Sequence, residues 1–491
     1  MSERAIVIGA GIGGLAAASL LASRGYSVDV YEKNGTPGGK MQQVHARGYR
    51  FDTGPSLFTM PFLLERLFSD CGRSMSDYLE IVEPEPLCRY FYKDGVRFDS
   101  YSDRKKAVSE IRTFAPGDTD AYVKFLDRAE EIYTKTSGAF IFNPLFELSD
   151  LKSLNLADFL NIDAFSTVSN VVDTYFDSPH LRQFFKRFAT YNGSSPFRAP
   201  ATLNVIPHVE LNQGGYYVNG GLYQIAESME KLAADLGVRF HYNKNVNRIL
   251  AGSSGAEGVE TEDGTVHKAE VVIANSDATD TILNLLPANA VSSLKRARQK
   301  KIEPSCSGFV LLLGCNRSWP ELVHHNIFFS EDYRHEFEQI FGEKKMPGDP
   351  TIYIANTSHT NPEHAPDSGS NLFILVNAPY LHDSQNWDEI TPAYADFLID
   401  ELESRGLNGL RNSVEFKETI NPNDFFERYR SNRGSIYGTA SNTRFSAFLR
   451  PRNKLRGIDR LYLVGGSTHP GGGIPLVIQS AFNAMELLDR E

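Results

Sequence analysis

The feature that most constrains this chain is a short apolar run followed by closely spaced glycines near its beginning. Residues 5–8 have the character of a strand buried in a parallel sheet. Glycines at positions 9, 11 and 14 have the G-x-G-x-x-G spacing that opens a helix after such a strand. The turn lets backbone approach a pyrophosphate, and the helix N-terminus adds free N–H groups. The pattern therefore predicts a strand, a tight turn and a helix that bind a dinucleotide.

An acidic residue and a second glycine pair indicate which dinucleotide is bound. The second predicted strand, residues 27–31, ends at Glu32, whose carboxylate can hold both hydroxyls of an adenosine ribose and so disfavours NADP. Gly38 and Gly39 follow soon after, a pattern typical of FAD proteins of the amine-oxidase type. Lys40 would offer a cation to the phosphates. The alternative interpretation is an ordinary glycine-rich turn.

Composition argues against several function classes. The formal net charge of −11 argues against a nucleic-acid partner, because phosphate binding is driven by basic surface. Four cysteines without a C-x-x-C motif indicate reduced thiols, with no disulfide and no metal site expected. The uncharged stretch 5–22 belongs to the dinucleotide motif, and no other apolar run approaches the length of a spanning helix. Peripheral attachment is the only membrane option left.

An aromatic-rich region, about 103–190, has a helical pattern. Four apolar residues there recur at i, i+3, i+4 and i+7 and predict an amphipathic helix: Leu181, Phe184, Phe185 and Phe188. The opposite face is polar and basic: Arg182, Gln183, Lys186 and Arg187. One interpretation is a core helix with a solvated basic face. The other is a helix that lines an apolar substrate tunnel or contacts a bilayer.

The order of patterns predicts an α/β protein with two intertwined domains, because 491 residues are too many for one core. A strand and glycine turn at 214–221 return the chain to the cofactor domain, and 461–481 adds a strand, a glycine-rich turn and a helix start. We expect a divided Rossmann-like FAD-binding domain, a mixed-sheet substrate domain and a helical cap. The FAD-binding parts are 1–80, 214–300 and 441–491. The substrate parts are 81–213, which is helical and contacts the membrane, and 301–440.

The chain resembles a known enzyme family over essentially its whole length. The N-terminal glycine motif, the element Asp52-Thr53-Gly54-Pro55 and the stretch 466–475 together look like the bacterial phytoene-desaturase type of carotenoid desaturases. Three further stretches look closest to the hydroxycarotenoid 3,4-desaturases: 187–193, 324–329 and 435–438. The resemblance implies non-covalent FAD as the cofactor and a cytoplasmic protein attached peripherally to membrane lipid. It also implies a carotenoid substrate, of the 1-hydroxy or γ-carotene type, and quinone or oxygen as electron acceptor.

The predicted cofactor-binding residues come from the glycine turns and their neighbours, and some, such as Val246, are placed by analogy with related flavoproteins. They are Gly9, Gly11, Gly13, Gly14, Glu32, Lys33, Gly39, Lys40, Gly54, Pro55, Ser56, Val246, Asn275, Gly465, Gly466, Gly473, Ile474, Pro475 and Val477.

A desaturase removes a hydride, for which flavin N5 is the acceptor, and a proton from the neighbouring carbon. The candidates for proton transfer are Asp177 and Arg182, in a stretch that resembles the family's proposed active-site region, and His469 near the flavin end. Alternatively, the first two form a helix cap and a surface charge, and His469 shapes its turn. A terminal hydroxyl at the blind end of the tunnel needs a polar partner, for which the candidates are Tyr191, Asn204 and His208.

Four other functions stay open at this stage. An amine oxidase shares the N-terminal motif, but the last cysteine is Cys315, so a covalent flavin tether near the C-terminus is absent. A multistep phytoene desaturase would act repeatedly on a short colourless triene. A carotenoid isomerase or retinol saturase of the same superfamily would differ in the bond count of its product. A non-enzymatic carotenoid-binding protein would have no reason to keep both flavin-binding ends.

Overall fold

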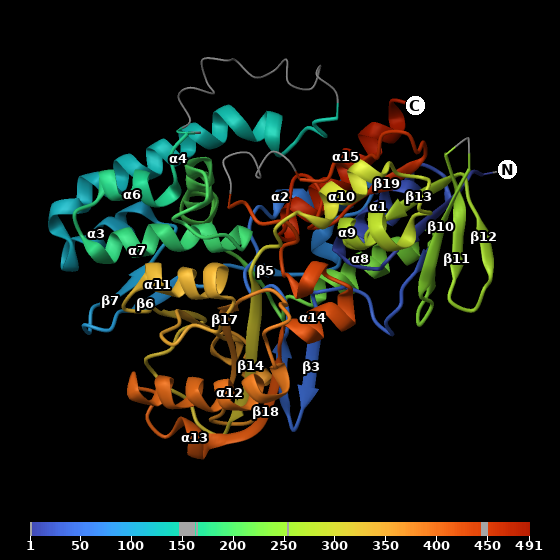
Figure 1. Ribbon diagram of the computed structural model, residues 1–491. Coiled ribbons are helices and arrows are strands. Elements are labelled where there is room, and N and C mark those ends of the chain that lie inside the picture. The colour runs from blue at the N-terminus through green and yellow to red at the C-terminus, as the bar shows by residue number, and fades with distance from the viewer. Residues whose placement is uncertain (1, 147–162, 164, 253–254, 443–449) are drawn as a thin grey trace.

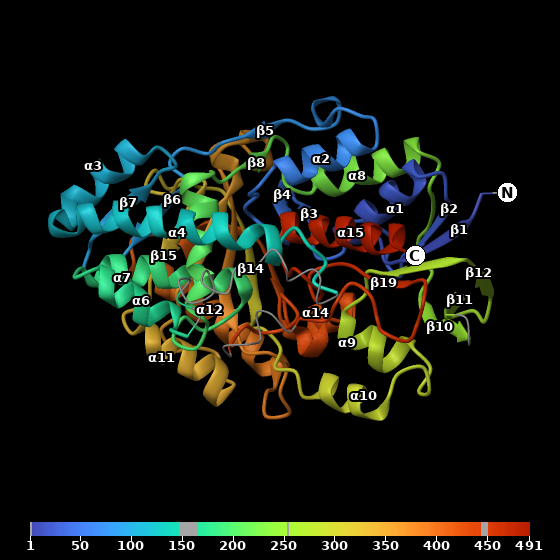
Figure 2. The same cartoon turned by 90° about the horizontal axis from the view of Figure 1, so that it is seen from above.

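Two sheets organise the molecule, and the computed structural model places them in separate halves of it (Figure 1). The structure describes residues 2–146, 163, 165–252, 255–442 and 450–491. One half holds a five-stranded sheet and the other a seven-stranded sheet. A cap of helices covers the seven-stranded sheet, as the view from above also shows (Figure 2).

The five-stranded sheet is entirely parallel, in the order β19-β13-β1-β2-β9. Its strands are β1 (Arg4–Ile8), β2 (Ser27–Tyr31), β9 (Arg239–His241), β13 (Val271–Ala274) and β19 (Leu461–Leu463). They come from three separate stretches of the chain. A small antiparallel sheet follows β9 and consists of β10 (Val246–Gly252), β11 (Gly255–Thr261) and β12 (Val266–Lys268). The mixed α/β fold class predicted from the sequence is confirmed.

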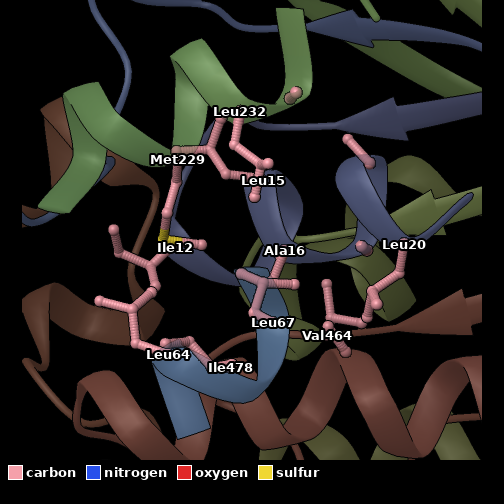
Figure 3. Close-up of a cluster of buried hydrophobic side chains, with 14 of the residues drawn as sticks. Ile12, Leu15, Ala16, Leu20, Leu64, Leu67, Met229, Leu232, Val464 and Ile478 are labelled. Atoms are coloured by element: carbon pink, nitrogen blue, oxygen red, sulfur yellow. The ribbon is translucent and has the colours of Figure 1, made fainter. Parts of the chain in front are cut away.

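Helix α1 (Ile12–Ser23) lies at the centre of the first core and fixes the glycine turn that precedes it (Figure 3). Its first ten residues are all buried, because small side chains let neighbours approach on every side. Three helices pack around it: α2 (Phe62–Asp70), α8 (Gln224–Asp235) and α15 (Ile474–Asp489). Leu15 of α1 lies beside Leu232 of α8, and Leu20 lies beside Val464, in this core.

The seven-stranded sheet has the order β18-β14-β17-β16-β15-β6-β7 and is antiparallel except between β15 and β6. Its strands are β6 (Cys88–Phe91), β7 (Arg97–Ser100), β14 (Ser307–Cys315), β15 (His325–Phe328), β16 (Ile352–Asn356), β17 (Ser370–Ala378) and β18 (Val414–Ile420). One face packs on α12 (Trp387–Ser404) and α13 (Leu410–Ser413). The other face is turned toward the cap (Figure 1).

The cap consists of α3 (Arg104–Phe114), α4 (Thr119–Phe140), α6 (Val168–Tyr175) and α7 (Pro179–Lys186). Short turns η4 (Arg187–Asn192), η5 (Ala201–Val205) and η6 (His208–Asn212) complete it. The apolar stripe predicted for this region is buried, as Leu181, Phe184 and Phe185 show. The sequence analysis placed Arg187 on the polar face opposite this stripe, and that prediction is wrong. Helix α7 ends at Lys186, and the tighter η4 turn carries Arg187 into the interior, where it is 7% exposed.

The remaining strands pair locally: β3 (Gln43–Ala46) with β4 (Tyr49–Asp52), and β5 (Ile81–Val82) with β8 (Tyr217–Val218). The remaining helices are α9 (Ala278–Asp280), α10 (Ser293–Lys300), α11 (Tyr333–Glu338) and α14 (Pro422–Tyr429). Among the described helices, none combines the length and the apolar character needed to cross a bilayer.

A buried ion pair anchors the end of β4 to the first domain. The Arg50 guanidinium donates two hydrogen bonds of 2.7 Å to the Asp52 carboxylate. Asp52 also accepts hydrogen bonds from the backbone N–H groups of Leu222 and Tyr223, just before α8, and from the Tyr217 hydroxyl. The turn that follows β4, residues 54–56, is therefore held at a fixed place between the two sheets.

Candidate flavin site and substrate cavity

Two glycine turns meet at the side chain of Asn275, which follows β13, and a third packs against the first of them. A Cβ atom on Gly11 would lie 2.7 Å from its Nδ2, and one on Gly465 would lie 2.7 Å from its Oδ1. Gly39 approaches Gly11 so closely that a Cβ there would lie 3.1 Å from the Gly11 Cα. The backbone at Gly11, Gly39 and Gly465 lines one large cavity, together with Asn275 and Gly9. The space in front of these turns is thus walled by backbone, as phosphates require.

Gly13 and Gly14, which the sequence analysis placed among the cofactor-binding residues, do not line the cavity. A Cβ on Gly14 would lie 2.1 Å from the Gly9 carbonyl oxygen. A Cβ on Gly13 would lie 3.0 Å from the Gly465 nitrogen. These two glycines let α1 pack against the strand and the C-terminal turn, which is the third role of the motif.

Glu32 stands at the end of β2 with its carboxylate held by backbone. Its Oε2 accepts a 2.8 Å hydrogen bond from the Ala10 N–H, and its Oε1 accepts one of 2.8 Å from the Asn34 N–H. Burial raises the pKa of this carboxyl, against the effect of these hydrogen bonds. Glu32 lines the cavity beside Val246, as a ribose-binding acid beside an adenine pocket would.

The two predicted lysines line the cavity, but backbone carbonyls hold both ammonium groups. Lys33 donates a 2.6 Å hydrogen bond to the Glu427 carbonyl. Lys40 donates to the carbonyls of Ser435 and Ile436 at 3.1 and 2.7 Å. Burial lowers the pKa of Lys40 to about 8. Lys40 therefore joins the first glycine region to the segment 435–436, in addition to any contact with an anion.

The C-terminal glycine turn leads into α15 and lines the other side of the same cavity. Its predicted residues Gly465, Gly466, Gly473, Ile474, Pro475 and Val477 all line it, as do Gly54, Pro55 and Ser56 from the turn after β4. Helix α15 starts at Ile474, so its free N–H groups and positive dipole end are presented there.

Arg450 is a cavity residue that the sequence did not reveal. It is 5% exposed and donates to the carbonyls of Tyr437 and Gly466 at 3.2 and 3.3 Å. Its buried Nη2 atom has no hydrogen-bond partner among the described residues, and burial lowers its pKa to about 10. A buried cation of this kind favours an anion nearby.

These groups fit FAD. We call the part of the cavity between the glycine turns the flavin cradle. It is lined by Gly11, Gly39 and Gly465, where an added Cβ atom would crowd neighbouring atoms, and the N-termini of helices α1 and α15 flank it. The Glu32 carboxylate, which suits a ribose, and the buried cations Lys40 and Arg450 complete the set of polar groups. The residues present therefore match an adenine dinucleotide whose flavin end lies between the turn 54–56 and the C-terminal turn.

The same cavity, of about 640 Å³, extends from the cradle into the space between the cap and the seven-stranded sheet. Its floor is a row of cross-strand neighbours, since Val310 pairs with Leu375, Leu375 with Tyr353, and Tyr353 with Ile327. Its roof comes from α4 and the turns η5 and η6: Thr136, Phe140, Ile141, Leu203, Val205, Ile206 and Val209. This part is predominantly apolar, as a hydrocarbon ligand requires.

A group of polar side chains interrupts the apolar wall, and we call it the polar belt: Ser56, Arg187, Tyr191, Glu210, His325 and Tyr353. Arg187 donates hydrogen bonds of 2.5 Å to the Glu210 carboxylate and to the Tyr90 hydroxyl. Tyr191 donates to the other oxygen of Glu210. Although burial would lower it, the neighbouring Glu210 carboxylate holds the pKa of Arg187 well above its ordinary value.

The belt reaches the flavin end through His325 and Tyr353. A hydrogen bond of 2.7 Å joins the His325 Nδ1 to the Tyr353 hydroxyl, and Tyr353 also interacts with the side chain of Ser56. Burial, with a contribution from Arg187, lowers the pKa of His325 to about 3, so this imidazole is neutral at physiological pH. The Nε2 atom of His325 is buried, and none of the residues that the structure describes forms a hydrogen bond with it.

The three residues proposed from sequence for proton transfer are not brought together. His469 lines the cavity, with its Nε2 hydrogen-bonded to the Asn143 carbonyl at 2.8 Å, and burial lowers its pKa to about 4. Asp177 is exposed, and Arg182 donates to the Phe176 carbonyl and lies 3.6 Å from Asp173. Neither Asp177 nor Arg182 lines the cavity, so the geometry does not support their proposed role.

Of the residues proposed to meet a substrate hydroxyl, only Tyr191 lines the cavity. His208 is turned away, with its ring nitrogens hydrogen-bonded to Asn212 and Gln213 at 2.9 and 3.1 Å. Asn204 is buried outside the cavity lining. Glu210, two residues after His208, was missed because neither its turn nor its partner could be recognised in the sequence.

The flavin cradle makes a first prediction. In Gly11→Val the new side chain occupies the space between Asn275 and the cavity, so the purified protein should contain almost no flavin. Glu32→Ala removes charge-assisted hydrogen bonds to ribose worth about 1.5–3 kcal/mol each and should also lose flavin. The measurement is the visible absorbance of flavin per mole of protein. Gly117→Val is the matched control, because a Cβ there meets open space; normal flavin content in Gly11→Val would contradict the placement.

Comparison with known proteins agrees with this reading of the site. Residues 12–487 match the family of flavin-containing amine oxidoreductases. The chain is 37% identical to a 1-hydroxycarotenoid 3,4-desaturase of Flavobacterium sp. (strain P99-3), over 99% of each protein. It is 36% identical to a 4,4′-diapolycopene oxygenase of Methylomonas sp., over 98% of this chain and 96% of that protein.

A solved structure shows the same fold. An oxidoreductase from Methanosarcina mazei superposes with a TM-score of 0.69 at 17% identity, over 98% of this chain and 100% of that chain. The family and cofactor predicted from the sequence are confirmed. The chain belongs to the flavin-containing amine oxidoreductases of the carotenoid desaturase type, and it is an oxidoreductase that depends on FAD.

Proposed function

We propose that this enzyme introduces a C=C bond into a carotenoid, at the C3–C4 bond of an acyclic end group that carries a hydroxyl at C1. The observation that carries the proposal is that one cavity joins the flavin cradle to the apolar space between the cap and the seven-stranded sheet. We call this apolar space the chamber, and the polar belt crosses it. The 37% identical 1-hydroxycarotenoid 3,4-desaturase supports the same substrate class.

The walls of the chamber suit a polyene. Aliphatic and aromatic side chains from the cap and the sheet exclude water from the chain of the substrate, such as Ile206, Val209, Ile327 and Phe373. Each CH₂ or CH group transferred from water to such walls contributes about 0.8 kcal/mol. An apolar chain of this kind needs no polar partner along its length.

The position of the polar belt favours an oxygenated end group. In a 1-hydroxy end group the oxygen is bonded only two carbons away from the C3–C4 bond. The group that binds this hydroxyl must therefore lie near the flavin end, and not at the blind end of the tunnel as the sequence suggested. Ser56 of the flavin turn contacts Tyr353, which places the belt at this end.

FAD supplies the chemistry that a desaturation needs, because its flavin accepts a hydride. The residues of this chain bind and orient the partners. The turn 54–56 and the C-terminal turn would hold the flavin end, and the floor row at Val310, Leu375 and Ile327 would set the plane on which the polyene lies. A quinone or oxygen would be the final electron acceptor, as the resemblance to carotenoid desaturases implies.

A carotenoid end-group oxygenase is the second candidate. The observation that favours it is the similarity to the 4,4′-diapolycopene oxygenase, which is only slightly lower than that to the desaturase. The two activities leave different products: a desaturation removes two hydrogens, whereas an oxygenation adds oxygen to the end group.

Purified holoenzyme decides between these functions. With liposomes that carry a 1-hydroxylated acyclic carotenoid, and a quinone as acceptor, we expect one product that has lost two hydrogens and absorbs at longer wavelength. Mass spectrometry of the product is the measurement. An oxygen-containing product from an unhydroxylated carotene would favour the oxygenase, and stepwise conversion of phytoene would favour the phytoene desaturase. No conversion of any carotenoid would refute the proposal.

Tyr191 tests the recognition of the hydroxyl. In Tyr191→Phe the substrate hydroxyl loses a partner, at a cost of about 1–3 kcal/mol. The kcat/KM for the hydroxylated carotenoid should therefore fall about tenfold or more relative to that for its deoxy analogue. Tyr333→Phe is the control, because Tyr333 lines the cavity outside the belt and should affect both substrates alike. An equal effect of Tyr191→Phe on both substrates would argue against hydroxyl binding there.

We also propose that the enzyme takes its substrate from membrane lipid by peripheral contact. The end of α4 lines the cavity through Phe140 and Ile141, and the nearby Phe142 ring lies 6.4 Å from that of Phe62. Phe62 is 41% exposed at the start of α2, so its ring is free to enter an apolar surface beside the end of α4. This face would bring the chamber close to the acyl chains.

Flotation with liposomes checks the membrane proposal. The folded wild-type protein should float with the vesicles, and Phe62→Ser should float less. Phe426→Ser removes a phenylalanine of α14 that is 50% exposed and should float like wild type. Failure of the wild-type protein to float at any lipid composition would contradict direct uptake from the bilayer.

A further inference from the structure

Glu210 is the carboxylate that stands in the apolar part of the cavity. Four acidic residues line the cavity among the described residues: Glu32, Asp277, Asp280 and Glu210. The first three belong to the cofactor end. Backbone N–H groups bond Glu32 and Asp277, and the Asn284 amide donates to Asp280. Glu210 faces the chamber from η6, between Ile206, Val209 and the floor of the sheet.

Burying a carboxylate in an apolar chamber costs desolvation free energy, so the presence of Glu210 there needs a reason. Glu210 is 3% exposed and Arg187 is 7% exposed, and the desolvation of such a pair often exceeds the attraction between its members. Apolar residues of similar size would line a hydrocarbon chamber better. The pair therefore points to a negative charge that the reaction uses.

The way in which Glu210 is held leaves it able to react. One carboxylate oxygen accepts from the Arg187 guanidinium at 2.5 Å, and the other accepts from the Tyr191 hydroxyl. A carboxylate has about four lone-pair sites, so each oxygen keeps one for a further partner. Arg187 is itself fixed by Tyr90 and by the Phe188 ring, 4.2 Å from its guanidinium carbon. The carboxylate thus has a defined orientation at the edge of the cavity.

We infer that Glu210 accepts the proton that the substrate loses, an inference that rests on the proposed desaturase function. One C–H bond breaks and its hydrogen leaves with the electron pair as a hydride, for which the bound flavin is the oxidant. The neighbouring C–H bond breaks and its hydrogen goes to a Glu210 oxygen as a proton. The electron pair of that second bond becomes the new C=C bond, so atoms and charge balance.

The two histidines at the cavity offer no negative charge. Burial lowers the pKa of His325 to about 3 and that of His469 to about 4, so both imidazoles are neutral at physiological pH and cannot stabilise a developing cation as a carboxylate does. The His469 Nε2 is also occupied by the Asn143 carbonyl. Before the proton leaves, the Glu210 charge also stabilises the positive charge that hydride loss creates on the polyene.

Anaerobic single-turnover kinetics of the holoenzyme test the inference. In Glu210→Gln, flavin reduction by the hydroxylated carotenoid should slow by roughly 100-fold or more, the range of a positioned acid–base group. FAD content and the substrate dissociation constant should stay at the wild-type values. Glu130→Gln is the matched control, because Glu130 lies exposed on α4 of the same cap, and it should reduce its flavin at the wild-type rate.

Two further measurements separate proton transfer from a structural role. Substrate deuterated at the carbon that loses the proton should give a larger isotope effect on flavin reduction in Glu210→Gln than in wild type, because proton loss becomes slow. In Glu210→Ala, added formate should restore part of the rate by occupying the place beside Arg187. Loss of a bulky buried group does not produce either response.

The outcomes are distinct. Wild-type enzyme that reduces its flavin, together with Glu210→Gln that does so equally fast, would overturn the role of Glu210 and leave the desaturase function standing. A slow Glu210→Gln without an isotope effect, together with a Glu210→Ala that formate does not restore, would also overturn it. Wild-type enzyme that no carotenoid reduces would refute the proposed function itself.

Discussion

Close contact of backbone with backbone at Asn275 is the constraint on which the rest of the structure depends. The turns at Gly11 and Gly465 meet there and the turn at Gly39 packs on Gly11, and each approach needs glycine because a Cβ atom would lie within 3.1 Å of a neighbouring atom. Their meeting places the ends of β1, β13 and β19 along one edge of a parallel sheet. Ligands of such sheets bind beyond the carboxyl ends of the strands. The cofactor end of the cavity is therefore fixed before any side chain contacts the cofactor.

The division of the chain follows from this geometry. A sheet whose strands come from the beginning, the middle and the end of the chain must let the chain leave twice and return twice. The two excursions build the seven-stranded sheet and its cap, with β6 and β7 from the first and β14 to β18 from the second. Pairing of β15 with β6 joins them. The substrate chamber lies between these excursions and the flavin turns, so neither domain could form it alone.

Local patterns predicted the cofactor half well, because glycine spacing and a buried strand act within a few residues of each other. The cradle around Gly11, Glu32 and Gly465 could therefore be placed from the sequence. The substrate half depends on contacts between distant residues, such as those of Arg187 with Glu210. The periodicity of α7 assigned Arg187 to a solvated face, and only the change to a 3₁₀ turn after Lys186 reverses that assignment. Asp177 lies in a stretch that resembles the family's proposed active-site region, but that resemblance does not tell which way its side chain points. The structure exposes Asp177 to solvent, outside the cavity lining.

The contrast between apolar walls and a charged pair limits the substrates that the chamber accepts. A substrate that is apolar throughout gains burial along its length but leaves the polar belt without a partner. A fully polar substrate would find partners only at the belt and would lose its hydration along the walls made by residues such as Val209 and Ile327. The substrate that we propose, a long polyene with one oxygen near the reacting bond, would satisfy both regions. Under that proposal the distance between oxygen and reacting bond, and not the overall polarity of the substrate, is the feature that the cavity would select.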